Sequence, residues 1–182
     1  MTTRVITPDN PYHPGKPFFP CRPAGLDEFA ASAYRYRTEA VLPCSPDALF
    51  DVFEDPVSWT VWAVGIKNVE WTSPKPYRVG TTRTVTFADG TEVYERFVAW
   101  ERGREMAFVL EGHTTEMFTS FGERYTVRDL GNGRCHLVWT VVYEPAGGFA
   151  RAHPWVKPAM KLAFKLYLFR LGRWCRKKGV RD

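Results

Sequence analysis

One acidic residue of this 182-residue chain stands where a proton could be transferred in an apolar setting. The stretch 114–129 alternates in the manner of a β-strand, in which every second side chain faces the same side of the sheet. Glu123 shares its parity with Phe121 and Tyr125, so we predict that its carboxyl group faces inward beside them. Glu123 is therefore the candidate catalytic residue of the chain.

The surroundings of Glu123 have several interpretations. Burying a carboxylate costs free energy unless the group is paired, so either its pKa is raised or an arginine such as Arg83 or Arg96 neutralises it. Water or the polar groups of a ligand would serve the same purpose. A purely structural ion pair, or a loss of parity at a bend near Gly122, would leave Glu123 without a functional role.

Other patterns of catalytic or metal-binding residues are missing from the sequence. His113 falls at a turn, where an exposed histidine is expected, and the other three histidines lack metal-ligand spacing with carboxylates. There is no phosphate-binding glycine loop and no Gly-x-Ser-x-Gly motif, so we expect neither a metal nor a cofactor. Glu92, Tyr94 and Arg96 share one strand face, which we expect to be a solvated outer face; the alternative is a polar cluster at the mouth of a cavity.

Capping and turn signals divide residues 34–144 into short elements. Ser45-Pro46 and Asp55-Pro56 each place a capping side chain before a proline at the first helical position, so two short helices should follow a first strand at 34–42. Alternating, β-branched segments separated by turns such as Asn132-Gly133 predict six further antiparallel strands. These strands are expected at 69–71, 80–87, 91–100, 105–111, 114–129 and 135–144.

The positive charge of the chain is concentrated at its C-terminal end. Residues 151–182 hold ten Lys or Arg and one acid, whereas the first 150 residues hold fifteen bases and nineteen acids. Apolar residues recur there at steps of three and four, which indicates one long helix whose start is limited by Pro154 and Pro158. The predicted apolar stripe consists of Val156, Met160, Ala163, Phe164, Tyr167, Leu171 and Trp174.

Composition suggests one domain with an N-terminal arm. A hydrophobic content of 45% is sufficient for a core, and no apolar run has the length of a signal peptide core or a membrane span, so we expect a cytoplasmic protein, with a peripheral membrane location as an alternative. Residues 1–33 are predicted to be a proline-rich arm, 34–178 the domain and 179–182 a tail. Four scattered cysteines indicate reduced thiols, and charge confined to one apolar-striped helix argues against nucleic acid.

This order of elements resembles the helix-grip fold of the START-like (SRPBCC) superfamily, and its polyketide cyclase/dehydrase branch in particular. The most specific match is the segment 43–62, with its capped helix, acidic break and tryptophan-bearing second helix. The resemblance covers residues 34–178. It implies an α+β fold in which a curved, seven-stranded antiparallel sheet wraps around the long C-terminal helix and encloses a mostly apolar cavity.

The resemblance implies a function in binding a hydrophobic small molecule, such as a lipid, an isoprenoid or a polyketide-like aromatic. The residues that we expect to bind it are Phe108, Met117, Phe121, Glu123, Tyr125, Trp139, Phe164 and Tyr167. One alternative is a polyketide cyclase, aromatase or dehydratase-type lyase in which Glu123 or a nearby tyrosine transfers a proton. Another is an assembly factor or membrane-surface protein that uses the proline arm and the basic helix. The sequence favours a non-catalytic carrier but leaves open whether the protein is an enzyme.

The back of the predicted C-terminal helix combines apolar and basic side chains. Its residues are Leu162, Leu166, Phe169, Arg170, Arg173 and Lys177. Apolar and basic groups exposed together are typical of a surface that contacts an anionic membrane or an acidic protein. Coverage by the N-terminal arm, or by a second subunit in a dimer, is the alternative.

Overall fold

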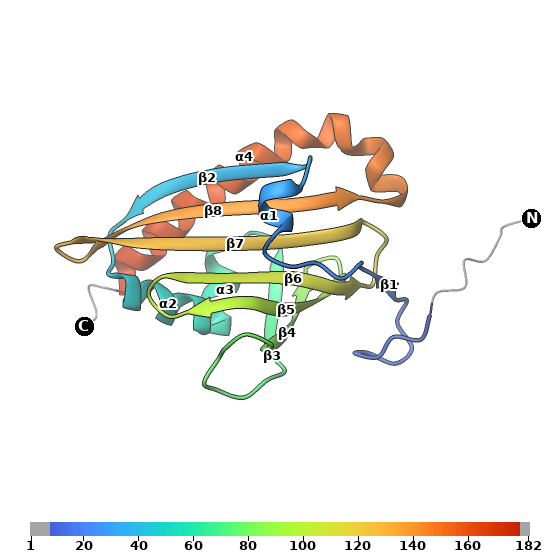
Figure 1. Cartoon of the computed structure of the whole chain (residues 1–182), viewed down its shortest axis with the longest axis horizontal. Coiled ribbons are helices and arrows are strands. Elements are labelled where there is room, and N and C mark those ends of the chain that lie inside the picture. Colours follow the sequence, from blue (N-terminus) through green and yellow to red (C-terminus); the bar gives the residue numbers. More distant parts are fainter. Residues whose placement is uncertain (1–7, 179–182) are drawn as a thin grey trace, which may run out of the picture.

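A single curved antiparallel sheet, closed on one side by a long helix, dominates this computed structural model (Figure 1). Residues 8–178 are described; the first seven residues of the predicted arm and the predicted tail 179–182 lie outside this range. The strands are β1 (Phe19–Pro20), β2 (Arg35–Leu42), β3 (Ile66–Trp71), β4 (Thr82–Phe87), β5 (Glu92–Glu101), β6 (Glu105–His113), β7 (Phe118–Gly131) and β8 (Arg134–Pro145). The helices are α1 (Glu28–Ala31), α2 (Pro46–Glu54), α3 (Pro56–Trp62) and α4 (Gly147–Lys178). The predicted α+β helix-grip fold is confirmed.

The seven longer strands form one continuous sheet. Their order is β2-β8-β7-β6-β5-β4-β3, so β3 to β8 follow one another as a meander and β2 returns to pair with β8. Helices α2, α3 and α4 lie behind the sheet in Figure 1, whereas α1 and the N-terminal arm lie in front of it. The main hydrophobic core therefore fills the space between the concave face of the sheet and the three helices behind it.

Two side-chain caps start the paired short helices, as the sequence predicts. The Ser45 hydroxyl accepts a hydrogen bond from the backbone N–H of Ala48 at 3.2 Å, and Asp55 Oδ1 accepts one from Val57 at 3.0 Å. These bonds satisfy donors that a helix start leaves without intrahelical partners. The helices bury Leu49, Phe50, Val52, Phe53, Ser58, Trp59 and Trp62 against the sheet.

Helix α4 begins earlier than its prolines suggest. Pro154 and Pro158 were expected to limit the start, yet both lie inside the helix. They are exposed and one turn apart, so the carbonyl groups that lose a donor can be hydrated, and the helix bends over this stretch (Figure 1). A hydrogen bond of 2.9 Å between the Tyr143 hydroxyl and His153 Nε2 holds this first part of the helix against β8.

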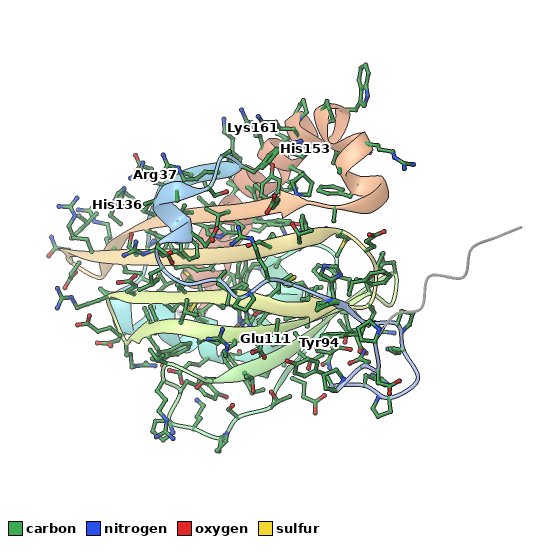
Figure 2. The ribbon with its side chains drawn as sticks, turned by 45° about the vertical axis from the view of Figure 1, so that its right-hand side comes forward. Arg37, Tyr94, Glu111, His136, His153 and Lys161 are labelled. Atoms are coloured by element: carbon green, nitrogen blue, oxygen red, sulfur yellow. The ribbon has the colours of Figure 1, made fainter. Side chains whose placement is uncertain are left out.

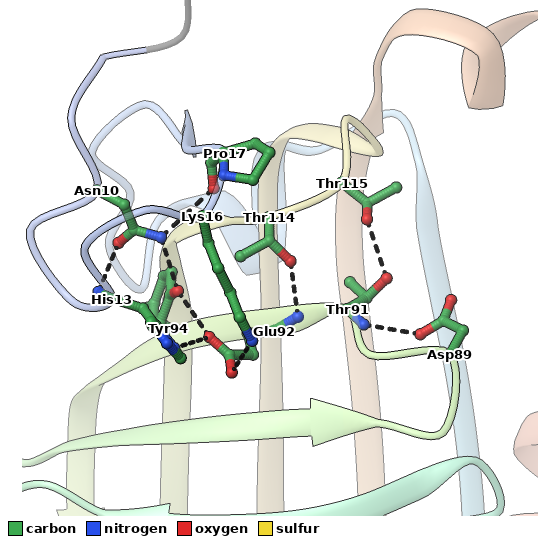
Figure 3. A network of polar contacts seen from close by, with 10 residues as sticks. All are labelled: Asn10, His13, Lys16, Pro17, Asp89, Thr91, Glu92, Tyr94, Thr114 and Thr115. Atoms are coloured by element: carbon green, nitrogen blue, oxygen red, sulfur yellow. Dashed lines mark hydrogen bonds and ion pairs between the residues drawn. The ribbon is translucent and has the colours of Figure 1, made fainter.

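The N-terminal arm packs on the outer face of its own sheet (Figure 3). Asn10 Nδ2 donates to the Tyr94 hydroxyl at 2.9 Å, Lys16 pairs with Glu92 at 2.6 Å, and the Tyr12 ring stacks on Tyr94 at 4.3 Å. Glu92 and Tyr94 do lie on the outer face, but the arm buries them both. The expectation that this face is solvated was therefore wrong, because the arm was not assigned to it.

The arm also completes the sheet where two strands separate. Strand β7 starts at Phe118 rather than at 114, and its pairing with β6 stops at Gly122. Beyond that point β1 pairs with Gly112 and His113 of β6, and the backbone N–H of Arg22 donates to Thr119 of β7 at 2.8 Å. The arm thus fills the gap between β6 and β7 that the meander leaves open.

Candidate functional site

A cavity of about 480 Å³ lies between the concave face of the sheet and helices α3 and α4. All eight residues predicted to bind a ligand line this cavity, although their binding role stays a prediction. They are Phe108, Met117, Phe121, Glu123, Tyr125, Trp139, Phe164 and Tyr167. The lining also includes Trp59, Trp62, Val85, Phe87, Val93 and Leu110, so aromatic and aliphatic side chains form most of the wall.

The register of β7 and β8 brings three polar groups together on this wall. Tyr125 stands opposite Trp139 across the two strands, and Glu123 lies two residues before Tyr125 on the same face. Glu123 Oε2 accepts a hydrogen bond from Trp139 Nε1 at 3.1 Å and another from the Tyr125 hydroxyl. Strand parity therefore holds at Glu123 despite the neighbouring Gly122.

The environment of Glu123 favours its protonated form. Burial raises the pKa of this carboxyl group to about 7, and the hydrogen bond from Tyr125 only partly opposes that shift. The nearby Glu95 charge raises the pKa further, whereas the charge of Arg83 lowers it. Burial and the neighbouring Glu123 also hold the pKa of Tyr125 well above its ordinary value. Near neutral pH, Glu123 can thus either accept or release a proton.

A buried ion pair lies on the adjoining strands. Arg83 of β4 stands directly opposite Glu95 of β5, with Nε and Oε2 2.5 Å apart. The Arg83 guanidinium also lies 4.1 Å from the centre of the Trp59 ring, a favourable cation–π distance. Burial raises the pKa of Glu95, and the Arg83 charge opposes that effect. Arg96, the other predicted partner of Glu123, instead pairs with Glu111.

Two hydrogen-bond donors on the cavity wall lack partners among the described residues. They are Arg83 Nη1 and Trp62 Nε1, and both side chains are almost fully buried. Leaving a buried donor unpaired costs about 1–3 kcal/mol, more for a charged group. An acceptor oxygen placed in the cavity would remove that cost, so the wall is suited to a molecule that is not purely hydrocarbon.

The Arg83–Glu95 pair and Trp62 were not among the predicted site residues. Strand parity contains a signal for the pair, because Arg83 has the parity of Val85 and Glu95 has that of Val93. Their opposition across β4 and β5 depends on the register with which these two strands pair. Sequence alone does not specify that register.

His113 differs from its expected environment. It was expected to be exposed at a turn, but it is fully buried at the end of β6. Its Nε2 lies 2.9 Å from the carbonyl oxygen of Phe118, and burial lowers its pKa. The Phe19 ring of the arm stacks against it, which explains why a nominal turn position is covered. His113 does not line the cavity.

A helix-grip sheet with an apolar cavity under its C-terminal helix defines the class of START-like ligand-binding folds. The chain belongs to the polyketide cyclase/dehydrase and lipid transport family, whose model matches residues 34–171. This confirms the family predicted from the sequence. A protein of Mycobacterium tuberculosis described as uncharacterized is 35% identical over 156 residues, which cover 86% of this chain and 93% of that protein.

Solved structures support the same fold at low sequence identity. The Zhui aromatase/cyclase of a Streptomyces species superposes with a TM-score of 0.66 at 11% identity, covering 79% of this chain and 94% of that one. A START superfamily protein of Mycobacterium smegmatis gives a TM-score of 0.63 at 14% identity, covering 80% and 99%. At these identities the likeness concerns architecture, and the chemistry has to be argued from the residues of the site.

Proposed function

We propose that this protein binds a hydrophobic small molecule, such as a lipid, an isoprenoid or a polyketide-like aromatic, in the cavity between the sheet and α4. The observation that carries the proposal is the wall of that cavity, which combines many aromatic side chains with a few grouped polar atoms. Its volume of about 480 Å³ falls in the range of about 300–1,000 Å³ that is typical of small-molecule sites.

The driving force would be the removal of apolar ligand surface from water. At roughly 25 cal/mol per Å², a ligand that buries about 300 Å² of apolar surface gains roughly 7 kcal/mol before the cost of immobilising it. Aromatic walls such as the stacked Tyr125 and Trp139 rings, 5.4 Å apart, suit a flat or ring-containing molecule.

The polar atoms of the wall narrow the class of ligand further. The free donors of Arg83 and Trp62 call for an acceptor, and the Glu123 carboxyl group can meet a hydroxyl. A molecule with an apolar body and keto, phenol or carboxylate oxygens satisfies these groups, whereas a plain hydrocarbon leaves the two donors unpaired.

A variant that fills the cavity tests this proposal. Met117 is half-buried on the wall, so Met117→Trp should occupy ligand space with little effect on the core. We expect the affinity for the fluorescent probe 1-anilinonaphthalene-8-sulfonate to fall at least tenfold in a titration. Val57→Trp is the matched control, because Val57 is exposed and does not line the cavity. Equal affinity in Met117→Trp and the wild type would contradict cavity binding.

A second candidate function is proton transfer on the bound molecule, of the kind a polyketide cyclase or dehydratase performs. It is favoured by the hydrogen-bonded Glu123 on the cavity wall, whose pKa of about 7 suits a general acid or base at neutral pH. A simple carrier would work with an unbroken apolar lining, and this lining is interrupted by Arg83, Glu95 and Glu123.

One substitution distinguishes the two candidate functions. Glu123→Gln retains a carbonyl oxygen that can accept the bonds from Tyr125 and Trp139 but cannot transfer the proton. With a linear poly-β-ketone as the probe, an enzyme would lose cyclised product by at least a hundredfold while probe binding stays within threefold of the wild type. If the wild type itself forms no cyclised product, the enzyme candidate is contradicted and the carrier function remains.

A further inference from the structure

The outer face of α4 carries an apolar stripe, and no other part of the described chain buries its side chains. Trp155, Leu162, Leu166 and Phe169 are 85%, 70%, 47% and 62% exposed. At 100° per residue these four positions fall within about 60° of one another around the helix axis. Trp155 and Phe169 are fourteen positions apart, which is about 21 Å of helix at 1.5 Å per residue. Large apolar patches of this kind mark interaction sites.

The same helix has charges of one sign. Between Gly147 and Lys178 the sequence contains nine Lys or Arg and no Asp or Glu. Lys165 and Arg173 are exposed beside the apolar stripe, and the Arg173 guanidinium lies 5.9 Å from the centre of the Phe169 ring. Cations therefore border the C-terminal half of the stripe.

The described part of the N-terminal arm, residues 8–33, does not cover this stripe. The arm lies on the convex side of the sheet, where it contacts Tyr94 and Glu111, whereas Lys161 lies on α4 at the far side of the molecule (Figure 2). The stripe also faces away from the cavity, because Phe164 and Tyr167 line the cavity from the opposite side of the helix. The face is thus separate from the ligand site, and its role does not depend on the proposed function.

We propose that this face of α4 docks on the surface of an anionic lipid bilayer. An interfacial helix of this class buries its apolar stripe about 5–10 Å into the headgroup region while Lys and Arg contact anionic headgroups. Trp155 fits that depth, since an indole has an apolar body and one polar N–H. No helix within residues 8–178 is long and apolar enough to cross a membrane, so the contact is peripheral.

The positive charge of α4 favours a bilayer over a second copy of this chain as the partner of this face. A symmetric dimer through this face would place two sets of cations opposite each other without an acid on either helix, and like charges at an interface are strongly unfavourable. A bilayer needs only a continuous negative surface, which matches bases distributed along the whole helix rather than gathered at one point. These features favour lipid over a protein with a fixed pattern of acids.

Vesicle flotation tests the proposal. The probes are phosphatidylcholine vesicles with and without phosphatidylglycerol, in about 0.1 M salt, where charges are screened over about 10 Å. We expect wild-type protein to partition at least tenfold more strongly into the anionic vesicles. The triple variant Trp155→Ser, Leu162→Ser, Phe169→Ser should lose at least tenfold of that binding, and it should fold normally because all three side chains are exposed.

The matched control removes apolar side chains of similar exposure elsewhere. Val57→Ser with Val79→Ser, at 63% and 59% exposed, should bind the anionic vesicles as the wild type does. The proposal is overturned if the wild type does not bind the anionic vesicles, or if the triple variant binds them as strongly as the wild type. It is also overturned if the wild type sediments as a dimer that the triple variant abolishes, or binds polyglutamate but no vesicle.

Discussion

The largely apolar cavity wall includes the charged side chains Arg83, Glu95 and Glu123, which are stabilised in two different ways. Arg83 is paired with Glu95 and stacked on Trp59, so its charge is compensated at short range. Glu123 has only neutral donors, Tyr125 and Trp139, and burial therefore shifts its pKa instead. The wall thus combines a fixed ion pair with a carboxyl group that titrates near neutrality.

Removing one partner of the ion pair should be far more harmful than removing both. Arg83→Met leaves Glu95 buried without a cation, and we expect the free energy of unfolding to fall by about 3–5 kcal/mol at pH 7. Replacing both with apolar side chains of similar size, in Arg83→Met with Glu95→Met, should recover most of that loss. Urea denaturation of the two variants measures this difference. Equal instability of the single and double variants would show that the pair itself is not responsible.

The raised pKa of Glu123 makes stability depend on pH with a defined sign. The folded protein holds this proton more tightly than the unfolded chain does, so stability is lost as pH rises from 4.5 to about 7. Relative to Glu123→Gln, the wild type should lose on the order of 3 kcal/mol across this window. Urea denaturation of both proteins at pH 4.5 and pH 8 provides the measurement. Parallel pH profiles would mean that the group titrates normally.

At the scale of elements, the arm compensates for a gap in the sheet. Strands β6 and β7 part beyond Gly122, and β1 takes up the free edge of β6. The Phe18 ring fits there only because residue 112 is glycine, since a Cβ atom on Gly112 would lie 2.2 Å from Phe18 Cε2. Packing at this one position therefore couples the arm to the sheet.

We expect Gly112→Ala to release the arm. Because the added methyl group also meets the Phe19 carbonyl oxygen at 3.0 Å, the ring and the strand must move, which should cost about 1–3 kcal/mol. Chymotrypsin should then cleave after Phe18 faster than in the wild type. Gly148→Ala is the control, because nothing lies within 4 Å of its added Cβ. Unchanged cleavage in Gly112→Ala would show that the arm is held by other contacts.

Local sequence signals predicted the helices and strands well, whereas features that depend on long-range contacts were not predicted. Ser45 and Asp55 cap their helices as expected, because capping is decided within a few residues. The start of β7 and the burial of His113 were missed, since both depend on an arm some 95 residues away in sequence. The early start of α4 was missed because tertiary contacts such as Tyr143–His153 outweigh the two prolines.

In the cavity, strand parity correctly predicted that Glu123 and its neighbours face inward. The hydrogen bonds that Tyr125 and Trp139 donate to Glu123 show that the three side chains share this face. Period-two alternation needs no knowledge of strand partners. The Arg83–Glu95 pair needed the register of β4 against β5, and the free donor of Trp62 needed the packing of α3. These are properties of assembled elements rather than of a local pattern.

At the scale of the whole molecule, the two sides of helix α4 face different environments. One side closes the cavity with Phe164 and Tyr167, and the other presents the exposed stripe from Trp155 to Phe169 among cations. This division explains why the chain has a net charge of +5 although its first 150 residues are acidic overall. The ligand site and the basic surface therefore use opposite sides of one helix.

Native mass spectrometry of the protein purified from its own cells tests the central claim most directly. If the cavity binds a hydrophobic small molecule, the wild type should carry a bound species at a 1:1 ratio, released on unfolding, and Met117→Trp should carry much less of it. Val57→Trp should retain the species as the wild type does. A wild-type spectrum with no bound species, or an adduct equally abundant in Met117→Trp, would contradict ligand binding in this cavity.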